Sequence, residues 1–295
     1  MLFQHKSPVI RGLSWIPVGL VTALIALEYV VFIRFHIRAK LLVGDDSIAL
    51  VLEFLAFNSL TALTAISYYR VVATDPGFIN DKLADYLRMR AQQAGIQLPN
   101  CRSCHKPKPS RAHHCSICKM CVVKMGTYIL VLVHHHCPWV GNCVGLRNYK
   151  YFYMFVTYGA ITCGLIVLRL FDPFFRAVHH MDNTLPLHAI LAYVMAASVT
   201  LSLTLFVGFH SYLISQGQST LELNVYGRRI PYRYREMAQN WRAVFGSNWH
   251  SWLLPLVPEN ADYDYMMWTR NHDVEAQRSY DDHDDDEESN VSLIL

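Results

Sequence analysis

Seven of the eight cysteines and six of the fifteen histidines lie in one stretch of the chain, Cys101 to Asn148. Pairs of cysteines separated by two residues recur in it, a spacing that lets two thiolates reach one tetrahedral zinc ion. The pairs are Cys101/Cys104, Cys115/Cys118 and Cys118/Cys121. With Cys143 they supply six thiolates, and two imidazoles complete eight ligands. The stretch therefore predicts a small domain that holds two structural zinc ions.

One cysteine remains after this count, and Cys137 is the best candidate for it. It follows His134, His135 and His136 and precedes Pro138. A thiol outside a closed metal site, beside an imidazole that can take its proton, is the arrangement that a nucleophile needs. In an extended backbone residues two apart share a face, so His135 would point the same way as Cys137. The alternative is that all seven cysteines only hold a zinc module together.

Long apolar segments flank this stretch on both sides. Hydrophobic residues make up 53% of the chain and charged residues 17%, a composition typical of membrane proteins. A membrane-spanning helix needs about 20 apolar residues, and four segments meet that length: Trp15–Ile33, Ile48–Val72, Tyr151–Leu170 and His188–Ile214. We expect an all-α integral membrane protein, with four transmembrane helices and the two-zinc domain between the second and the third.

The expected organisation of the chain follows from these segments. Residues 1–73 hold the N-terminus and two spans, 74–149 the cysteine-rich domain, 150–214 the other two spans, 215–260 a C-terminal cytosolic element and 261–295 a tail. Asp281 to Glu288 is nearly all acidic, which is typical of disorder. Asp81 to Ala94 predicts an amphipathic helix, interpreted as a solvated connector. Glu28, inside the first span, is expected at the membrane interface.

The distribution of charged residues predicts the orientation of the chain in the membrane. Lys and Arg outnumber acids between Lys82 and Arg147, so the positive-inside rule places this segment and both termini in the cytosol. Arg34, Arg38 and Lys40 oppose this orientation but are outnumbered. A cytosolic location favours zinc over disulfides. The net charge is only +3 and no Lys/Arg-rich arm is present, so the lipid bilayer, and no nucleic acid, is the expected partner.

The central stretch strongly resembles the DHHC family of protein S-acyltransferases (palmitoyltransferases). The resemblance rests on Cys101-x2-Cys104-x9-His114-Cys115-x2-Cys118-x2-Cys121, on His135-His136-Cys137-Pro138-Trp139, and on Asn142-Cys143-x-Gly145 with Asn148. Further matches are Asp75-Pro76-Gly77, Ser219-Thr220-Leu221-Glu222 and Asn240–Gly246. The resemblance covers roughly Trp15 to Gly246.

The resemblance implies a role for each of these residues. One zinc ion takes Cys101, Cys104, His114 and Cys121, and the other takes Cys115, Cys118, His136 and Cys143. Cys137 is the nucleophile that accepts the acyl group, and His135 is its general base. The implied supporting residues are Asp75, Asn148, Thr220 and Glu222.

The implied activity is transfer of a long-chain acyl group, palmitoyl, from acyl-CoA to cysteine thiols of membrane-associated proteins. An acyl-Cys137 intermediate carries the group, and the acyl chain lies in the space between the third and fourth helices. The implied location is an endomembrane, the Golgi or the endoplasmic reticulum.

Two departures from the family pattern bear on activity. His134 stands where the family has an Asp that supports the base, and eight residues, Gly126–Val133, are inserted before it. Doubling a flexible loop costs about 0.6 kcal/mol, far less than the ~10–16 kcal/mol of structural zinc binding, so the zinc sites should survive the insertion. Loss of the carboxylate predicts reduced activity. The alternative is a membrane scaffold or adaptor that retains the zinc-binding fold.

Overall fold

The computed structural model describes residues 8–95, 97–109, 112–123, 136–179, 185–216 and 237–258. Within them, four helices are long and apolar enough to cross a membrane. The first is α1 (Pro8–Phe32), which continues through a π turn, η1 (Ile33–Ile37), into α2 (Arg38–Leu42); the others are α3 (Ile48–Ala73), α5 (Tyr149–His179) and α6 (Leu187–Gln216). The predicted fold class is therefore confirmed, with the cysteine-rich region between the second and third spans.

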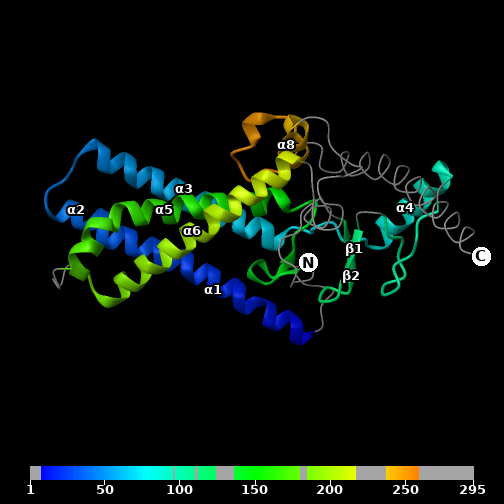
Figure 1. Cartoon of the computed structure of the whole chain (residues 1–295), viewed down its shortest axis with the longest axis horizontal. Coiled ribbons are helices and arrows are strands. Elements are labelled where there is room, and N and C mark those ends of the chain that lie inside the picture. The colour runs from blue at the N-terminus through cyan, green and yellow to red at the C-terminus, as the bar shows by residue number, and fades with distance from the viewer. Residues whose placement is uncertain are drawn as a thin grey trace, which may run out of the picture.

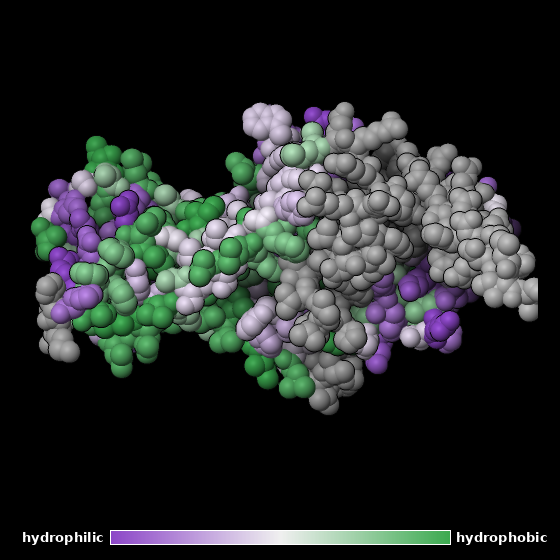
Figure 2. Space-filling model, in the orientation of Figure 1, coloured by the Kyte–Doolittle hydropathy of each residue, from purple (hydrophilic) through white to green (hydrophobic). Residues whose placement is uncertain are grey.

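The four long helices form one bundle, and the cysteine-rich region projects beyond one end of it (Figure 1). α5 packs against both α3 and α6. Apolar residues dominate the visible surface of the bundle, and polar residues gather at its far end (Figure 2). Leu168, Leu201 and Leu205 are among the exposed apolar side chains. An apolar exterior of this extent marks a surface that faces lipid.

A charged network at the far end of the bundle explains why the first span runs past its predicted end at Ile33. The π turn carries His36, whose Nε2 lies 3.0 Å from Oε1 of Glu53 on α3. The same oxygen lies 2.5 Å from Nε of Arg169 on α5. Charged groups inside or near a membrane are tolerated when they pair with one another. Three helices are therefore joined through one carboxylate.

Glu28 does not lie at the interface, so that expectation is wrong. Its side chain is buried, with 7% exposed, and neither carboxyl oxygen has a hydrogen-bond partner among the described residues. The helix continues as far as Leu42, which places Glu28 well inside the span instead of near its end. We have no physical account of why a carboxyl group is kept there.

The cysteine-rich region is built from two short antiparallel strand pairs. β1 (Ala112–Cys115) pairs with β2 (Met120–Val123), and β3 (His136–Cys137) pairs with β4 (Asn142–Cys143). A single 3-10 turn, η2 (Pro138–Val140), joins the second pair. Strands this short are not stable alone, so other contacts must hold them in place.

The helix α4 (Asp81–Ala94) has the predicted bounds. The Asn80 side chain accepts a hydrogen bond from the Leu83 backbone at its start, and Gly95 ends it with a φ of +70°, as expected of these caps. Its interpretation as a solvated connector is wrong. Ala84 and Leu87 are buried in a cluster with Cys101, Ala112, Cys121 and Val123, because the apolar face of the helix covers the first strand pair.

The C-terminal element is a short helix, α8 (Met237–Phe245), followed by a 3-10 turn, η3 (Trp249–Ser251). The Asn240 side chain donates to the Ser215 carbonyl (3.1 Å), and the Trp241 indole N–H donates to the Ser215 hydroxyl (3.1 Å). α8 therefore packs against the end of α6. The predicted acidic tail lies outside the described residues.

Glu53→Gln should lower the apparent melting temperature of the detergent-solubilised protein, because it leaves the Arg169 guanidinium and His36 without their shared carboxylate. Breaking a largely buried ion pair costs about 3–5 kcal/mol. The Arg169 side chain is 50% exposed, so we expect about 1–3 kcal/mol. Asp85→Asn is the control, since the Asp85–Arg88 pair is exposed. Equal melting temperatures for both variants would contradict a structural role for the network.

Candidate active site and metal centres

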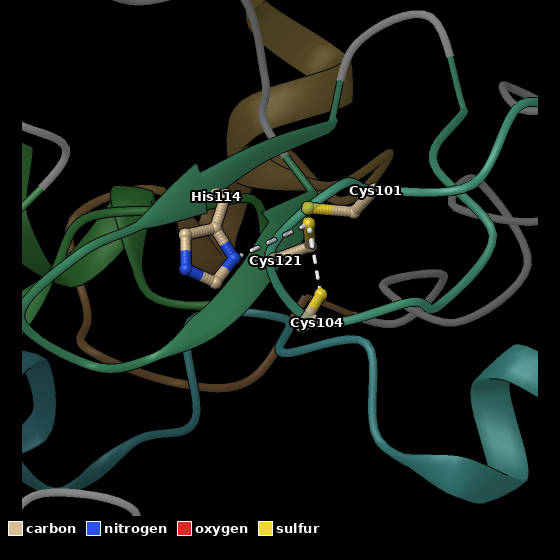
Figure 3. Close-up of side chains that lie close together, drawn as sticks. All are labelled: Cys101, Cys104, His114 and Cys121. Atoms are coloured by element: carbon tan, nitrogen blue, oxygen red, sulfur yellow. Dashed lines mark hydrogen bonds between the residues drawn. The ribbon is translucent and has the colours of Figure 1, made fainter.

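Four predicted zinc ligands converge at the first strand pair (Figure 3). The ligand atoms of Cys101, Cys104, His114 and Cys121 all lie within 4.8 Å of one another. The sulfurs of Cys104 and Cys121 are 3.5 Å apart, and His114 Nδ1 is 4.0 Å from the Cys121 sulfur. A turn in which His105 has a φ of +56° and its N–H donates to the Cys101 carbonyl brings the two ends of the first Cys-x2-Cys pair together.

The other four predicted ligands form a second, fully buried cluster of Cys115, Cys118, His136 and Cys143. The Cys118 sulfur lies 3.6 Å from the Cys143 sulfur and 3.4 Å from His136 Nδ1. His136 Nδ1 is also 3.9 Å from the Cys143 sulfur. This cluster joins residues that precede and follow Gly126–Val133, the segment interpreted as an insertion, so its ligands meet across that segment.

The donor sets fit zinc. A tetrahedral ion with Zn–S bonds of 2.3 Å separates its ligand atoms by about 3.8 Å, close to the distances in both clusters. The two clusters share β1, because neighbouring residues of a strand point to opposite faces. His114 therefore serves the first cluster and Cys115 the second. Each cluster can be closed by its own four protein ligands.

Cys137 belongs to neither cluster. It follows His136 on β3 and is the residue that precedes the η2 turn, with its side chain half-buried. Burial raises the pKa of the Cys137 thiol, and the backbone N–H groups of Trp139 and Val140 lower that pKa in part. His134 and His135 lie outside the described residues, so the shared face of His135 and Cys137 stays a prediction.

Two asparagine side chains join this region to the membrane helix α3. The Asn148 side chain, fully buried, donates to the carbonyls of Val71 (3.2 Å) and Cys143 (2.9 Å) and accepts from the Gly145 N–H (2.8 Å). The Asn142 side chain donates to the carbonyls of Val72 (3.2 Å) and Thr74 (3.0 Å). The last carbonyls of a helix have no partner within it. Residues beside a metal cluster therefore cap α3.

Asp75 builds the turn that leaves α3. Its carboxylate accepts from the N–H groups of Gly77 (2.8 Å) and Phe78 (2.9 Å), an Asx turn. The Gly77 carbonyl then accepts from the Val123 N–H on β2 (3.0 Å). Gly145 lies so close that a Cβ atom would collide with the Pro76 carbonyl oxygen. The turn is therefore packed between β2 and the loop that carries Cys143.

Comparison with known proteins agrees with this geometry. The profile of the DHHC palmitoyltransferase family matches residues 96–226, which include both clusters and Cys137. "Probable protein S-acyltransferase 12" of Arabidopsis thaliana is 31% identical over 277 residues, covering 88% of this chain and 92% of the relative. The chain belongs to the DHHC palmitoyltransferase family. "Palmitoyltransferase ZDHHC2" of Rattus norvegicus is 29% identical over 292 residues, covering 85% of this chain and 75% of the relative.

The structure also contains a groove that is lined almost wholly by apolar side chains. It lies between α1 and α3, with a volume of about 570 Å³, and its lining includes Val18, Ile25, Ala65 and Tyr68. The resemblance implies a different place for the acyl chain, between the third and fourth spans, α5 and α6. Tyr68 and Val18 stand at the end of the groove that meets the Cys137 loop, because η2 packs against α1 and α3.

Tyr68 is a site residue that the sequence analysis missed. Its hydroxyl donates to the Trp139 carbonyl (2.8 Å) and lies 3.3 Å from the Val18 carbonyl. Cys137 packs against the apolar cluster that contains Tyr68. A tyrosine within an apolar helix carries no sequence signal of this contact. The implied supporting residues Thr220 and Glu222 lie outside the described residues.

Cys118→Ala should lower the metal content of the protein from about two ions per chain to about one, because it removes a thiolate from the second cluster only. Cys137→Ser is the matched control and should retain both ions. Inductively coupled plasma mass spectrometry of the purified protein measures the content. Loss of metal in Cys137→Ser would show that this thiol is a ligand and not a free nucleophile.

Tyr68→Phe should slow acylation of the enzyme at saturating acyl-CoA by about tenfold, because the Cys137 loop loses its hydrogen bond to α3. The KM for acyl-CoA and the metal content should stay unchanged. The ring still packs against Phe155, whose centroid is 4.8 Å away. Tyr212→Phe, the same change at an exposed position of α6, is the control. An unchanged rate in Tyr68→Phe would remove this residue from the site.

Proposed function

We propose that this chain transfers a palmitoyl group from acyl-CoA to cysteine thiols of membrane-associated proteins through an acyl-Cys137 intermediate. The observation that carries the proposal is the position of Cys137. It is excluded from two closed clusters of four ligands, yet it lies beside the second cluster. It also packs, with Val18 and Tyr68, in the same apolar cluster at the end of the groove.

In this proposal both clusters hold structural zinc. Cys101, Cys104, His114 and Cys121 bind one ion, and Cys115, Cys118, His136 and Cys143 bind the other. Four protein ligands leave no position open for a substrate. Zinc therefore supplies folding free energy to the domain, and the chemistry belongs to the side chains around Cys137.

The first step forms the acyl-enzyme. His135 takes the proton of the Cys137 thiol, and the thiolate attacks the carbonyl carbon of the acyl-CoA thioester. A new carbon–sulfur bond forms to Cys137 while the bond to the CoA sulfur breaks, and the CoA thiolate leaves with the proton returned by His135. In the second step His135 takes the proton of a protein cysteine thiol, and the resulting thiolate attacks the carbonyl carbon of acyl-Cys137. A carbon–sulfur bond forms to that protein while the bond to the Cys137 sulfur breaks, and His135 returns the proton to the Cys137 thiolate.

We propose that the groove between α1 and α3 binds the acyl chain within the membrane. Its lining is almost wholly apolar, so an acyl chain fills it without leaving a polar group unpaired. We propose that the thioester reaches Cys137 at the Tyr68 end while the chain lies along α1 and α3. Asp75 and Asn148 support the site by fixing the turn after α3 and the loop after Cys137. Thr220 and Glu222 are proposed as further supports.

The excess of basic residues around the domain supports a cytosolic site and cytosolic termini. The acyl-CoA donor and the proteins that accept the group would then meet Cys137 at the cytosolic face of the bilayer. By its family membership we propose an endomembrane location, the Golgi or the endoplasmic reticulum.

We propose reduced activity because His134 replaces the family's Asp. A neutral imidazole can accept a hydrogen bond from His135, but it does not offset the positive charge that develops on that base. In a nucleophile–histidine–carboxylate triad with a serine nucleophile, neutralising the carboxylate lowers kcat by up to about 10⁴. A cysteine is more acidic and depends less on its base, so the loss here should be smaller.

Cys137→Ser should abolish covalent labelling of the purified protein by labelled palmitoyl-CoA, and His134→Asp should increase the labelling rate at least about tenfold. Cys163→Ser is the matched control, since this thiol lies in α5 outside both metal clusters, and it should label like the unmodified chain. The label is measured in phospholipid nanodiscs and should be released by neutral hydroxylamine, as a thioester is.

The same experiment separates the enzyme from a scaffold. Absence of label in every variant, with both metal ions still bound, would leave a membrane protein that retains the fold without the reaction. Label that persists in Cys137→Ser would place the acyl group on another residue and overturn the proposed mechanism.

A further inference from the structure

The segment after α8 exposes an unusual number of apolar side chains. Trp249 to Pro258 reads Trp-His-Ser-Trp-Leu-Leu-Pro-Leu-Val-Pro, and we call it the apolar segment. Leu253 is 72% exposed and Val257 62% exposed. Trp249, Leu254 and Leu256 are also exposed. A continuous apolar surface of this kind marks a contact with a partner or a membrane.

Two contacts with α5 fix the depth of this segment. The Lys150 ammonium donates to the Ser251 carbonyl (2.9 Å), and the Tyr158 hydroxyl donates to the Leu253 carbonyl (2.6 Å). No charged residue occurs in α5 between Lys150 and Arg169, so this part of the helix crosses the hydrocarbon. Tyr158 lies about 12 Å along the helix from Lys150. The Leu253 backbone, which is bonded to Tyr158, therefore lies at the depth of the hydrocarbon and not in the water outside the membrane.

The polar groups of the apolar segment suit such an environment. Irregular backbone is tolerated within a bilayer only where its hydrogen bonds are made inside the protein. The Trp252 and Leu254 N–H groups donate to the Trp249 and Ser251 carbonyls (3.1 and 3.2 Å). The Leu256 N–H donates to the Leu254 carbonyl (2.7 Å). Pro255 and Pro258 have no N–H to satisfy.

The inner side of the apolar segment is attached to the protein, which leaves the outer side for lipid. The Trp252 indole N–H donates to the Gly246 carbonyl (2.9 Å), and its ring packs on Phe245 with centroids 5.5 Å apart. In Figure 1 the segment, in orange, turns from α8 back along the bundle, away from the cysteine-rich region. The backbone of the apolar segment is therefore held by the protein, while the side chains of its exposed leucines and of Val257 point outward.

We infer that the apolar segment inserts into the leaflet next to the cysteine-rich domain, with Leu253, Leu256 and Val257 against phospholipid acyl chains. Trp249, at its start, then lies at the level of the head groups, where tryptophan is enriched. The segment attaches α8 to the bilayer. Through Lys150 it also holds the end of α5, which begins directly after Asn148.

Photo-crosslinking of the full zinc-loaded chain tests this inference. A benzophenone amino acid replaces Leu253, and the protein is placed in nanodiscs of phosphatidylcholine with an alkyne at the end of one acyl chain. Leu201 on α6, which faces lipid, and Met89 on α4 are matched exposed positions. Lipid labelling at position 253 should be within about twofold of position 201 and far above position 89, because only the first two contact hydrocarbon.

Lipid labelling at position 253 that is no higher than at position 89 would overturn the inference. So would crosslinks from position 253 mainly to protein, either to a second copy or to the chain's own tail. Hydrogen exchange of the unmodified protein gives an independent measurement. Amides of residues 249–257 should be protected in nanodiscs and should exchange faster when Leu253, Leu256 and Val257 are all changed to Ser, while peptides from the four spans keep their protection.

Discussion

The structure depends on the hydrogen bonds from Asn142 and Asn148 to the last carbonyls of α3. These carbonyls lie at the buried end of a membrane helix, where no further turn can satisfy them. Both asparagines come from the loop that contains Cys143 and follows Cys137. One set of contacts therefore ends the helix and fixes the loop after Cys137 relative to α3. Tyr68 adds a third link to the same loop from one turn earlier on α3.

Apart from these hydrogen bonds, few contacts stabilise the cysteine-rich region. Its strands are two to four residues long, and its apolar cluster depends on α4 for cover. Zinc ions at the two clusters would supply the missing free energy. Because His114 and Cys115 are neighbours on β1 but serve different clusters, a distortion at one cluster is transmitted to the other. With metal bound, the region that carries the free thiol of Cys137 would therefore depend on both clusters for its stability.

Within the bilayer the same rule applies at both ends of the bundle: polar groups are paired inside the protein and apolar groups face outward. At the far end Glu53 joins α1 and α5 through His36 and Arg169. At the near end Lys150 and Tyr158 satisfy carbonyls of the apolar segment. Glu28 is one exception, since neither of its oxygens has a hydrogen-bond partner among the described residues, and the buried hydroxyls of Ser67 and Thr157 are two others.

The sequence by itself determined the four membrane helices, the bounds of α4 and the positions of the metal-binding residues, because hydropathy, helix caps and Cys-x2-Cys spacing are local signals. Only the tertiary structure decided what depends on distant contacts. It placed Glu28 inside the bundle, α4 against the first strand pair, the groove between α1 and α3, and Tyr68 beside Cys137. The amphipathic pattern of α4 does not say what its apolar face contacts, and the other features have no periodic or spaced pattern, since each arises where side chains from separate elements meet.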